Sequence, residues 1–349
     1  MAFWLDIAAF LVKALIIVAA LGGLAVLIAR LARSSEPKDH EIKVRSLDER
    51  YDDMRDAVNG ALLDRKERKA LAKTLKKEAK AAAKARRGET PGKRIYVLAF
   101  KGDMRASAVK RLGAEIDAVL IAARAGTDEA VIRIESPGGT VTGYGLAAAE
   151  ILRLRERKIN VTASVDQVAA SGGYMMACAA DRIVAAPFAI VGSIGVVAPV
   201  PNLHRLLKKN EIDFEEITAG EFKRTVSVLG EITPAGREHF REKLDTTHQA
   251  FKAHVAECRP KVDIVRVANG DYWLAREAVP LGLVDEIMTG DELLFRARDT
   301  ARLYEVSTEA RKTLLQQLLS GLGTTAQKLA DLVIARLAER SSGRPHLSS

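Results

Sequence analysis

The most apolar part of the chain lies at its N-terminus. Residues 7–29 are apolar except for one lysine, Lys13. About 20 apolar residues are enough for a helix to cross the hydrocarbon core of a membrane, and a lysine near one end can extend its ammonium group to the interface. A cleaved signal peptide is the alternative, but the basic residue inside the apolar run argues against it. We therefore predict an uncleaved transmembrane anchor within residues 1–34.

The charges that flank this anchor bear on its orientation. Arg30, Arg33 and Lys38 follow it and outnumber the basic groups that precede it. By the positive-inside rule, the rest of the chain would lie in the cytoplasm. The difference in charge is small, so the sequence leaves the orientation open.

A polar, helix-forming segment follows the anchor. Residues 46–88 are mainly good helix formers without proline, and Gly88, Pro91 and Gly92 end the pattern. We predict that residues 35–92 form a charged helical region between the anchor and the body of the protein.

From residue 94 onward, short apolar runs alternate with amphipathic segments. Such alternation predicts right-handed βαβ units and a largely parallel sheet, that is, an α/β fold. We expect strands at 95–100, 130–134, 161–165 and 183–185, and helices at 106–124, 142–156 and from 171. The pattern beyond 234 favours helices. We therefore divide the chain into an α/β domain, 93–300, and a helical extension, 301–349, whose apolar positions fall at helical spacing over 314–340.

Composition excludes a disordered protein, because 48% of the 349 residues are hydrophobic. The net charge of +9, from 54 Lys and Arg against 45 Asp and Glu, suggests a polyanionic partner. Between residues 65 and 94, however, there are thirteen basic and three acidic side chains, so the rest of the chain is close to neutral.

The basic segment 65–94 has three interpretations. Clusters of Lys and Arg near a membrane anchor are attracted to anionic lipid head groups. Binding to nucleic acid is the second interpretation, but the segment has no interleaved aromatic residues and no recognisable reading module, so we expect no specific nucleic-acid partner. The third is a solvated helix that spaces the anchor from the body.

Cysteine and histidine give no sign of a metal enzyme. Cys178 and Cys258 are too few for a disulfide framework and lack metal-ligand spacing, and the six histidines include no HExxH motif. Cys178 follows small apolar residues, so we expect a buried free thiol there. We expect neither a metal ion nor an organic cofactor.

The candidate catalytic residues lie in glycine-containing turns at the ends of predicted strands, which is where open α/β sheets place their ligand-binding sites. The first turn, Ser-Pro-Gly-Gly-Thr-Val at 136–141, could bring backbone amides close to an oxyanion. It matches no phosphate-binding loop, and an ordinary strand-to-helix turn is the alternative.

The second turn, Ala-Ala-Ser-Gly-Gly-Tyr at 169–174, opens a small-residue helix. Ser171 would gain from the positive end of the helix dipole, and the amide of Gly172 is placed to donate to an oxyanion. Taken alone, Ser171 fits a helix N-cap better than a nucleophile.

A serine nucleophile needs a base. None of the histidines lies in a comparable glycine-rich turn, and there is no GxSxG motif. Lys223 follows a strand-like segment, 214–218, and a glycine, but it could act as a base only if burial or neighbouring cations kept it neutral. Ser193, in the third turn Val-Gly-Ser-Ile-Gly-Val at 191–196, could orient such a lysine, or could be a turn serine bonded to the backbone.

In combination, these motifs resemble the signal peptide peptidase A family. The likeness rests on residues 136–139, 170–174, 192–196 and 220–223 in this order, with Lys223 lying 52 residues after Ser171 as the family spacing requires. Two later segments, 270–275 and 281–285, also match, and the N-terminal anchor and charged helix fit the layout of family members.

The resemblance implies a ClpP/crotonase-type fold of repeated β-β-α and βαβ units with a serine–lysine dyad. Ser171 would be the nucleophile and Lys223 the general base and later the general acid. Gly139 and Gly172 would supply the oxyanion-hole amides, and Ser193 would hold Lys223 in place.

The resemblance also implies an endopeptidase that cleaves hydrophobic or signal-peptide-like peptides at the bacterial inner membrane, with its catalytic domain in the periplasm. We expect a ring-like homo-oligomer in which the lysine can come from a neighbouring subunit, so that Ser171 and Lys223 of one chain would lie too far apart to bond. Two alternatives stay open: an inactive membrane-anchored scaffold of the same fold, and a crotonase-like acyl-CoA enzyme.

Overall fold

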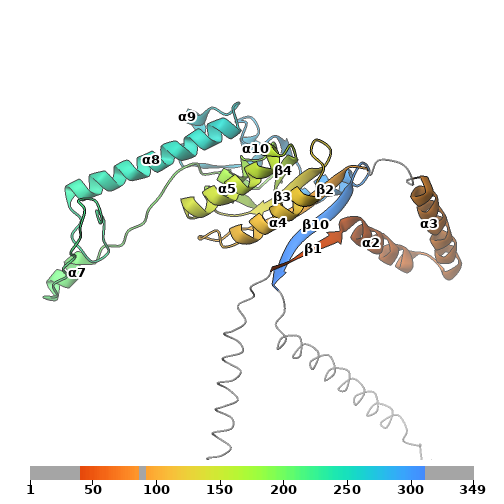
Figure 1. Cartoon of the computed structure of the whole chain (residues 1–349), viewed down its shortest axis with the longest axis horizontal. Coiled ribbons are helices and arrows are strands. Elements are labelled where there is room, and N and C mark those ends of the chain that lie inside the picture. The colour runs from red at the N-terminus through yellow and green to blue at the C-terminus, as the bar shows by residue number, and fades with distance from the viewer. Residues whose placement is uncertain (1–39, 86–91, 311–349) are drawn as a thin grey trace, which may run out of the picture. The chain divides into compact units, whose positions relative to one another are not determined.

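The computed structural model describes residues 40–85 and 92–310 (Figure 1). The chain divides into two compact units, one of residues 42–308 and one of the two terminal segments, and we describe the first. The expected anchor at 7–29 and the expected helix at 314–340 lie outside the described residues. Within the described residues, no helix is long and apolar enough to cross a membrane.

The centre of the unit is a seven-stranded sheet with the order β1-β10-β2-β3-β4-β6-β9. From β10 to β9, every neighbouring pair of strands is parallel. The strands are β1 (His40–Ser46), β2 (Arg94–Lys101), β3 (Glu129–Glu135), β4 (Asn160–Val165), β6 (Arg182–Ala185), β9 (Glu286–Ile287) and β10 (Arg302–Ala310).

Both faces of this sheet are covered, as its apolar sequence requires. In β2, Leu98 and Phe100 belong to the core on one face, whereas Ile95 and Val97 pack in a second cluster. Helices α4 (Val109–Ala122) and α5 (Val141–Glu156) bury apolar side chains in the first core. Helices α2 (Leu47–Leu62) and α11 (Gly290–Ala297) contribute Leu47 and Leu294 to the second. Parallel strands buried on both faces are typical of α/β proteins, so the predicted α/β class is confirmed.

A small second sheet positions the glycine turns in which the candidate catalytic residues lie. It consists of β5 (Val168–Ala170), β7 (Ile190–Gly192) and β8 (Tyr272–Leu274), in that order. A single bridge between Ser136 and Ala169 joins the end of β3 to β5. Directly after β5 comes α6 (Gly172–Ala177), a short helix whose residues are all buried.

The longest helix of the described residues, α8 (Pro234–Cys258), comes well after the third glycine turn in the chain. It begins at Thr233, whose hydroxyl accepts a hydrogen bond from Gly236 N, and it has a proline in its first turn. Phe251 and Val255 are its buried residues. The short helix α7 (His204–Lys209) lies in the segment between β7 and α8, below the N-terminal end of α8 in the view and apart from it (Figure 1). Two further short helices, α9 (Ile264–Val267) and α10 (Ala275–Ala278), follow α8.

Three local expectations differ from the structure. The helix expected over 46–88 is interrupted, because Asp64 accepts hydrogen bonds from the N–H groups of Lys66 and Glu67 and so starts a new helix, α3 (Arg65–Ala85). Residues 302–310, expected in the helical extension, form β10. The strand-like segment 214–218 is an exposed loop.

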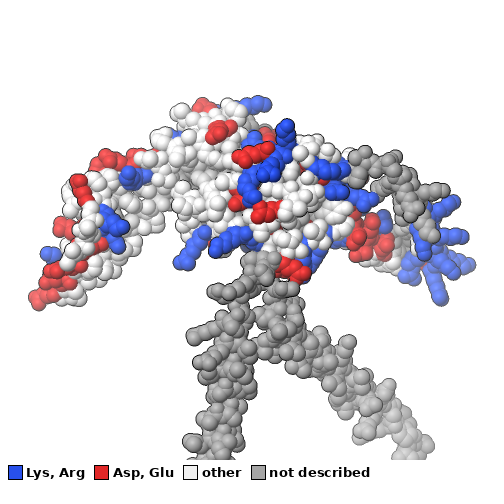
Figure 2. All heavy atoms as spheres, viewed as in Figure 1, with Lys and Arg blue, Asp and Glu red and all other residues white. Residues whose placement is uncertain are grey.

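The basic side chains of α3 up to Lys77 are exposed (Figure 2). Lys and Arg gather on this helix in the view, whereas charges of both signs are scattered over the rest of the described surface. The described part of the basic segment is therefore a solvated helix, and its possible attraction to lipid stays a prediction.

Candidate active site

The first glycine turn, 136–140, is held by a chain of hydrogen bonds. The hydroxyl of Tyr144 donates to the Asp103 carbonyl at 2.8 Å and lies 2.6 Å from the Ser136 hydroxyl. Because the single tyrosine proton goes to Asp103, the Ser136 hydroxyl donates to Tyr144, and it also accepts from Gly138 N at 3.1 Å. Burial raises the pKa of Tyr144, which keeps this hydroxyl a donor. The turn is therefore fixed from beneath by α5.

Glycine is needed in this turn for steric reasons. Gly138 has a φ of +93°, which side chains disfavour. A β-carbon on Gly139 would lie 2.2 Å from the Met104 carbonyl oxygen. The backbone N–H of Gly139 donates to no protein acceptor within the described residues, so it is free to bind a ligand.

Ser171 stands in a strained conformation between β5 and α6. Its φ of +51° and ψ of −117° are rare for a residue with a side chain, and such strain is concentrated at functional sites. Its own N–H donates to the Gly192 carbonyl at 2.7 Å, and its side chain makes no capping hydrogen bond to α6. The N-cap explanation for this serine is therefore not supported, and its hydroxyl is left available.

A small pocket brings together three of the five residues singled out in the sequence. Gly139, Ser171 and Gly172 all line it. In the described part of the chain, Gly172 N has no protein acceptor either, and it lies at the first turn of α6. The remaining lining residues come from α5, α6, the third glycine turn and α8: Val141, Met175, Gly195, Val196, Thr247 and Phe251. An oxygen that develops negative charge beside Ser171 could receive two backbone N–H groups there.

Ser193 follows β7 and also has a positive φ, +53°. Its N–H donates to the Asp271 carbonyl at 2.7 Å, and its hydroxyl donates to the Gly270 carbonyl at 3.4 Å. The residue thus lies two positions before Gly195 of the pocket, in a turn that is tied to the segment before β8. The sequence allowed two roles for Ser193, a serine that orients Lys223 or a turn serine bonded to the backbone. These contacts match the second role.

Lys223 is exposed and does not line the pocket. Its neighbour Phe222 stacks on His239 of α8, with 3.9 Å between the ring centroids. His239 precedes Thr247 of the pocket by two turns of α8, about 12 Å along the helix axis at 1.5 Å per residue. Within one chain, Lys223 therefore lies next to a residue stacked on the N-terminal half of α8, outside the pocket that contains Ser171.

Large apolar side chains are exposed along residues 197–228, the stretch of chain that contains Lys223. Ile217 is 94% exposed, Val197 86% and Phe222 54%. Solvent contact over so many large apolar groups in one stretch of chain is typical of a surface that binds a partner. Others in the same stretch are Val200, Leu203, Leu206, Ile212, Phe214 and Val228.

The structure also brings together three residues that the sequence analysis did not combine: Cys178, His254 and Cys258. The expected buried free thiol at Cys178 is confirmed. The neighbouring Cys178 thiol and the His254 ring lower the pKa of Cys258 to about 5, and burial raises the pKa of Cys178. The spacing of His254 and Cys258, four residues apart on one helix face, is the signal that could have pointed to the cluster.

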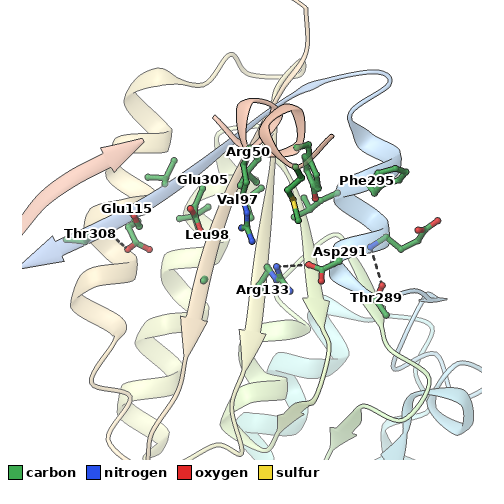
Figure 3. Close-up of a pocket in the computed structure, with 18 of the residues that line it drawn as sticks. Arg50, Val97, Leu98, Glu115, Arg133, Thr289, Asp291, Phe295, Glu305 and Thr308 are labelled. Carbon is green, nitrogen blue, oxygen red and sulfur yellow. Dashed lines mark hydrogen bonds and ion pairs between the residues drawn. The ribbon is translucent and has the colours of Figure 1, made fainter. Parts of the chain in front are cut away.

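A larger cavity of about 590 Å³ lies elsewhere, between α2, α11 and the sheet (Figure 3). None of the residues singled out in the sequence lines it. Glu115 of α4 is buried at one side; its Oε1 accepts from Thr308 N at 2.8 Å, and its Oε2 has no partner within the described residues. Burial raises the pKa of this carboxyl group.

Comparison with known proteins places the chain in a family. The model of peptidase family S49 matches residues 153–304, and the model of its N-terminal region matches residues 2–151. The chain is 41% identical to the SohB protease of Haemophilus influenzae, over 90% of this chain and 91% of that protein. It is 39% identical to a SohB protease of Buchnera aphidicola, over 84% of this chain and 99% of the relative.

A more distant relative is the chloroplastic serine protease SPPA of Arabidopsis thaliana, 33% identical over 56% of this chain and 30% of that protein. Among solved structures, a membrane-bound stomatin-specific protease is similar over 66% of this chain and 99% of its own, at 14% identity and a TM-score of 0.41. The matches to the SohB proteases show that the chain belongs to peptidase family S49, as a SohB-like member.

Proposed function

We propose that this member of peptidase family S49 is a serine endopeptidase in which Ser171 forms an acyl-enzyme. The observation that carries the proposal is the geometry of Ser171. It has a strained backbone, it lies in a pocket, and it does not cap the helix that it precedes. Such a serine serves no evident structural purpose, whereas a nucleophile must present its hydroxyl in this way.

Besides a nucleophile, the reaction needs hydrogen-bond donors for the oxyanion. The two free amides beside Ser171 could supply them. When Ser171 Oγ attacks a peptide carbonyl, the carbonyl oxygen becomes an oxyanion. The N–H groups of Gly139 and Gly172 would stabilise it, with help from the dipole at the start of α6. Removing one such donor typically lowers the rate by roughly two to three orders of magnitude.

Lys223 is the proposed base, acting across a subunit boundary. It would take the proton of Ser171 Oγ and return it to the nitrogen of the leaving peptide, after which water hydrolyses the ester. Because Phe222 keeps Lys223 of the same chain beside the N-terminal half of α8, we propose that Lys223 of the partner subunit completes the site. The exposed apolar side chains of residues 197–228 would then be covered by that partner in a ring-like homo-oligomer. Contact with the neighbouring subunit would also supply the burial that a neutral lysine requires.

The remaining parts of the proposal come from the sequence and the family resemblance. We propose a ClpP/crotonase-type fold, for which the β4–β5–α6 segment provides one β-β-α unit. Residues 1–34 would anchor the enzyme in the bacterial inner membrane, with the basic helix near lipid. The proposed substrates are hydrophobic or signal-peptide-like peptides, with the catalytic domain in the periplasm. The positive-inside count opposes that orientation, and protease accessibility of the catalytic domain in intact and lysed cells would decide between the two.

An active-site probe tests the catalytic proposal directly. A fluorophosphonate should label the full chain in detergent, and peptide mapping should find the label on Ser171. Ser171→Ala should lose both the label and peptidase activity, whereas Thr300→Ala, which removes an exposed hydroxyl just beyond α11 from a residue that does not line the pocket, should keep both. Peptidase activity that survives Ser171→Ala would refute the mechanism. A protein that is neither labelled nor active, but still assembles, would instead be a scaffold. Tight binding of coenzyme A would favour the acyl-CoA enzyme.

A further inference from the structure

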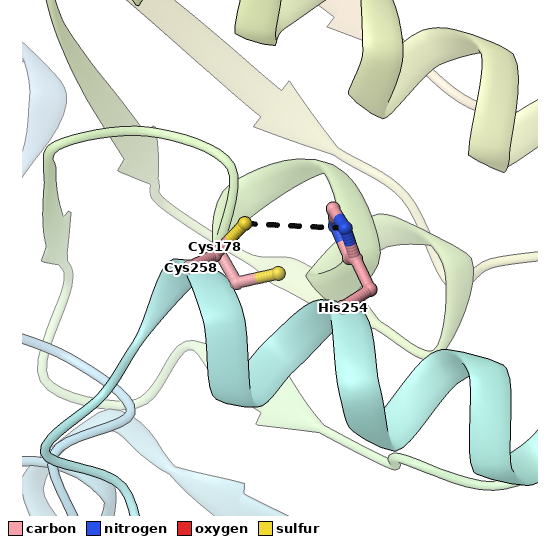
Figure 4. A group of neighbouring side chains, drawn as sticks. All are labelled: Cys178, His254 and Cys258. Carbon is pink, nitrogen blue, oxygen red and sulfur yellow. Dashed lines mark hydrogen bonds between the residues drawn. The ribbon is translucent and has the colours of Figure 1, made fainter.

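Cys178, His254 and Cys258 form a cluster at the contact between α6 and α8 (Figure 4). Cys178 follows directly after α6, and the other two residues lie on the last two turns of α8. Their ligand atoms all lie within 4.8 Å of one another. Cys178 is fully buried, and His254 and Cys258 are partly buried, so the cluster lies near the surface without being open to it.

The hydrogen bonds of His254 fix which of its ring nitrogens can bind a ligand. Nε2 lies 3.0 Å from the Met175 carbonyl oxygen. A carbonyl oxygen only accepts, so Nε2 carries the proton and Nδ1 keeps its lone pair. Nδ1 faces the Cys258 sulfur at 3.9 Å. In metal sites, a histidine ligand is oriented in the same way, by donation from its other nitrogen to a carbonyl or carboxylate oxygen.

We propose that Cys178, His254 and Cys258 bind one zinc ion, with a fourth position left for water. Zn–S and Zn–N bonds of about 2.3 and 2.0 Å put tetrahedral ligand atoms roughly 3.5–3.8 Å apart. The distance of 3.9 Å between Nδ1 and Cys258 Sγ is already close to this value. The distances from Cys178 Sγ to the other two ligand atoms are at most 4.8 Å, so side-chain adjustment would bring the three atoms to a tetrahedral arrangement. Two thiolates and an imidazole favour zinc over magnesium or calcium, which prefer oxygen ligands.

Binding would exchange protons for metal–sulfur bonds. The Cys178 thiol now donates to the Met175 carbonyl at 3.3 Å. It would lose its proton to solvent and form a Zn–S bond, and so would Cys258 to the extent that it carries a proton. His254 would keep its bond to Met175, because Nε2 takes no part in coordination.

The ion would clamp α6 to α8. Helix α6 begins directly after Ser171, and α8 carries Thr247 and Phe251 of the same pocket. Cys178 lies at the opposite end of α6 from Ser171, so the proposed ion has a structural role and takes no part in the chemistry. The inference therefore stands whether or not Ser171 is the nucleophile.

The test is titration of the purified full chain, without a histidine tag, reduced by a phosphine and stripped by a chelator. With Zn²⁺ alone, one ion should bind per chain. With Co²⁺ alone, a thiolate-to-metal absorption band should appear. His254→Phe and Cys258→Ser, at partly exposed positions, should weaken Zn²⁺ binding by about tenfold or more and abolish the band. His248→Ala is the matched control, because His248 lies on the same helix and also bonds a backbone carbonyl, that of Ile194. Its binding should match that of the unaltered chain.

Three results would overturn the proposal. The first is Zn²⁺ binding by the unaltered chain no tighter than by Cys258→Ser. The second is a cobalt spectrum without thiolate bands. The third is a Cys178–Cys258 disulfide in protein kept under reductant. Circular dichroism of the metal-free variants guards against loss of the fold, and a rise in Tm with Zn²⁺ that His254→Phe lacks would support the site independently.

Discussion

A β-carbon on Gly138 would lie 2.8 Å from the β-carbon of Ser171. The first glycine turn is therefore packed directly against the serine turn, although the two residues come from different strand ends. The same β-carbon would lie 2.8 Å from Gly172 N, the amide proposed to bind the oxyanion. The absence of a side chain at 138 thus allows the proposed nucleophile, Ser171, and both proposed donors to lie within one small pocket.

Gly138→Ala should damage both stability and activity. The new methyl group would contact Ser171 and Gly172, and the positive φ would add strain of roughly 1–3 kcal/mol. We expect a lower free energy of unfolding in urea and a fall of at least about tenfold in kcat/KM. Gly145→Ala is the control, since a β-carbon there meets nothing within 4 Å and alanine favours helix. If Gly138→Ala were as stable and active as the unaltered enzyme, the packing argument would be wrong.

Tyr144→Phe should weaken the support beneath the first glycine turn. It removes the hydroxyl that bonds Ser136 and the Asp103 carbonyl, leaving buried polar groups without a partner at a cost of about 1–3 kcal/mol. Because Ser136 positions Gly138 N, kcat should fall more than KM changes. Tyr272→Phe, at an exposed position, should change neither value. An unchanged kcat in Tyr144→Phe would show that the turn does not depend on this hydrogen-bond chain.

Lys223→Arg should be as inactive as Lys223→Ala. Arginine keeps the positive charge but cannot give up its proton near neutral pH, so it cannot act as a base. We expect a loss of about 100-fold or more in kcat for both variants. The secondary structure of each variant by circular dichroism should match that of the unaltered protein, because the side chain is exposed within its own subunit. Lys209→Arg on α7 is the control and should retain activity. Substantial activity in Lys223→Arg would exclude proton transfer by this residue.

Glu115→Gln should alter the pH dependence of stability. Burial raises the pKa of Glu115 in the folded state, so the protonated form is favoured there. Its contribution to stability is present below the unfolded-state pKa and is lost as pH rises through the folded-state pKa. The variant should therefore exceed the unaltered protein in Tm at pH 7–8, by about 2–4 °C per kcal/mol, and lose this advantage near pH 4. Glu215→Gln, at an exposed position, should show no such pH dependence.

The sequence predicted the glycine turns well because each one follows an apolar strand. Turns 136–140 and 171–173 indeed lie at strand ends and meet in the pocket. The hydrogen-bond chain through Tyr144 could not be foreseen, since it depends on how α5 packs beneath the turn. The strand expected at 214–218 is absent: its two large apolar residues, Phe214 and Ile217, are three positions apart and do not give the alternation that a half-buried strand needs.

Contacts between residues far apart in the sequence could not be predicted from local patterns. Strand β10 pairs with β2, more than 200 residues earlier in the chain, although its alternating pattern around Leu303 was visible. The cluster at the α6–α8 contact was missed because Cys178 lies 76 residues before His254. Only the packing of α8 on α6 brings them together.

Mixing two inactive variants shows whether Ser171 and Lys223 act together across a subunit boundary. Ser171→Ala and Lys223→Ala should each be inactive alone. When the two are co-expressed in equal amounts, a site that draws its serine from one variant and its lysine from the other is intact. Random assembly in a closed ring should then restore about one quarter of the unaltered activity.

Co-expression of Ser171→Ala with the double variant Ser171→Ala/Lys223→Ala is the matched control, because no combination of these chains supplies a serine. It should stay inactive. Activity should therefore recover only in the first mixture. Mixed oligomers of Ser171→Ala and Lys223→Ala without activity would contradict a dyad shared between subunits.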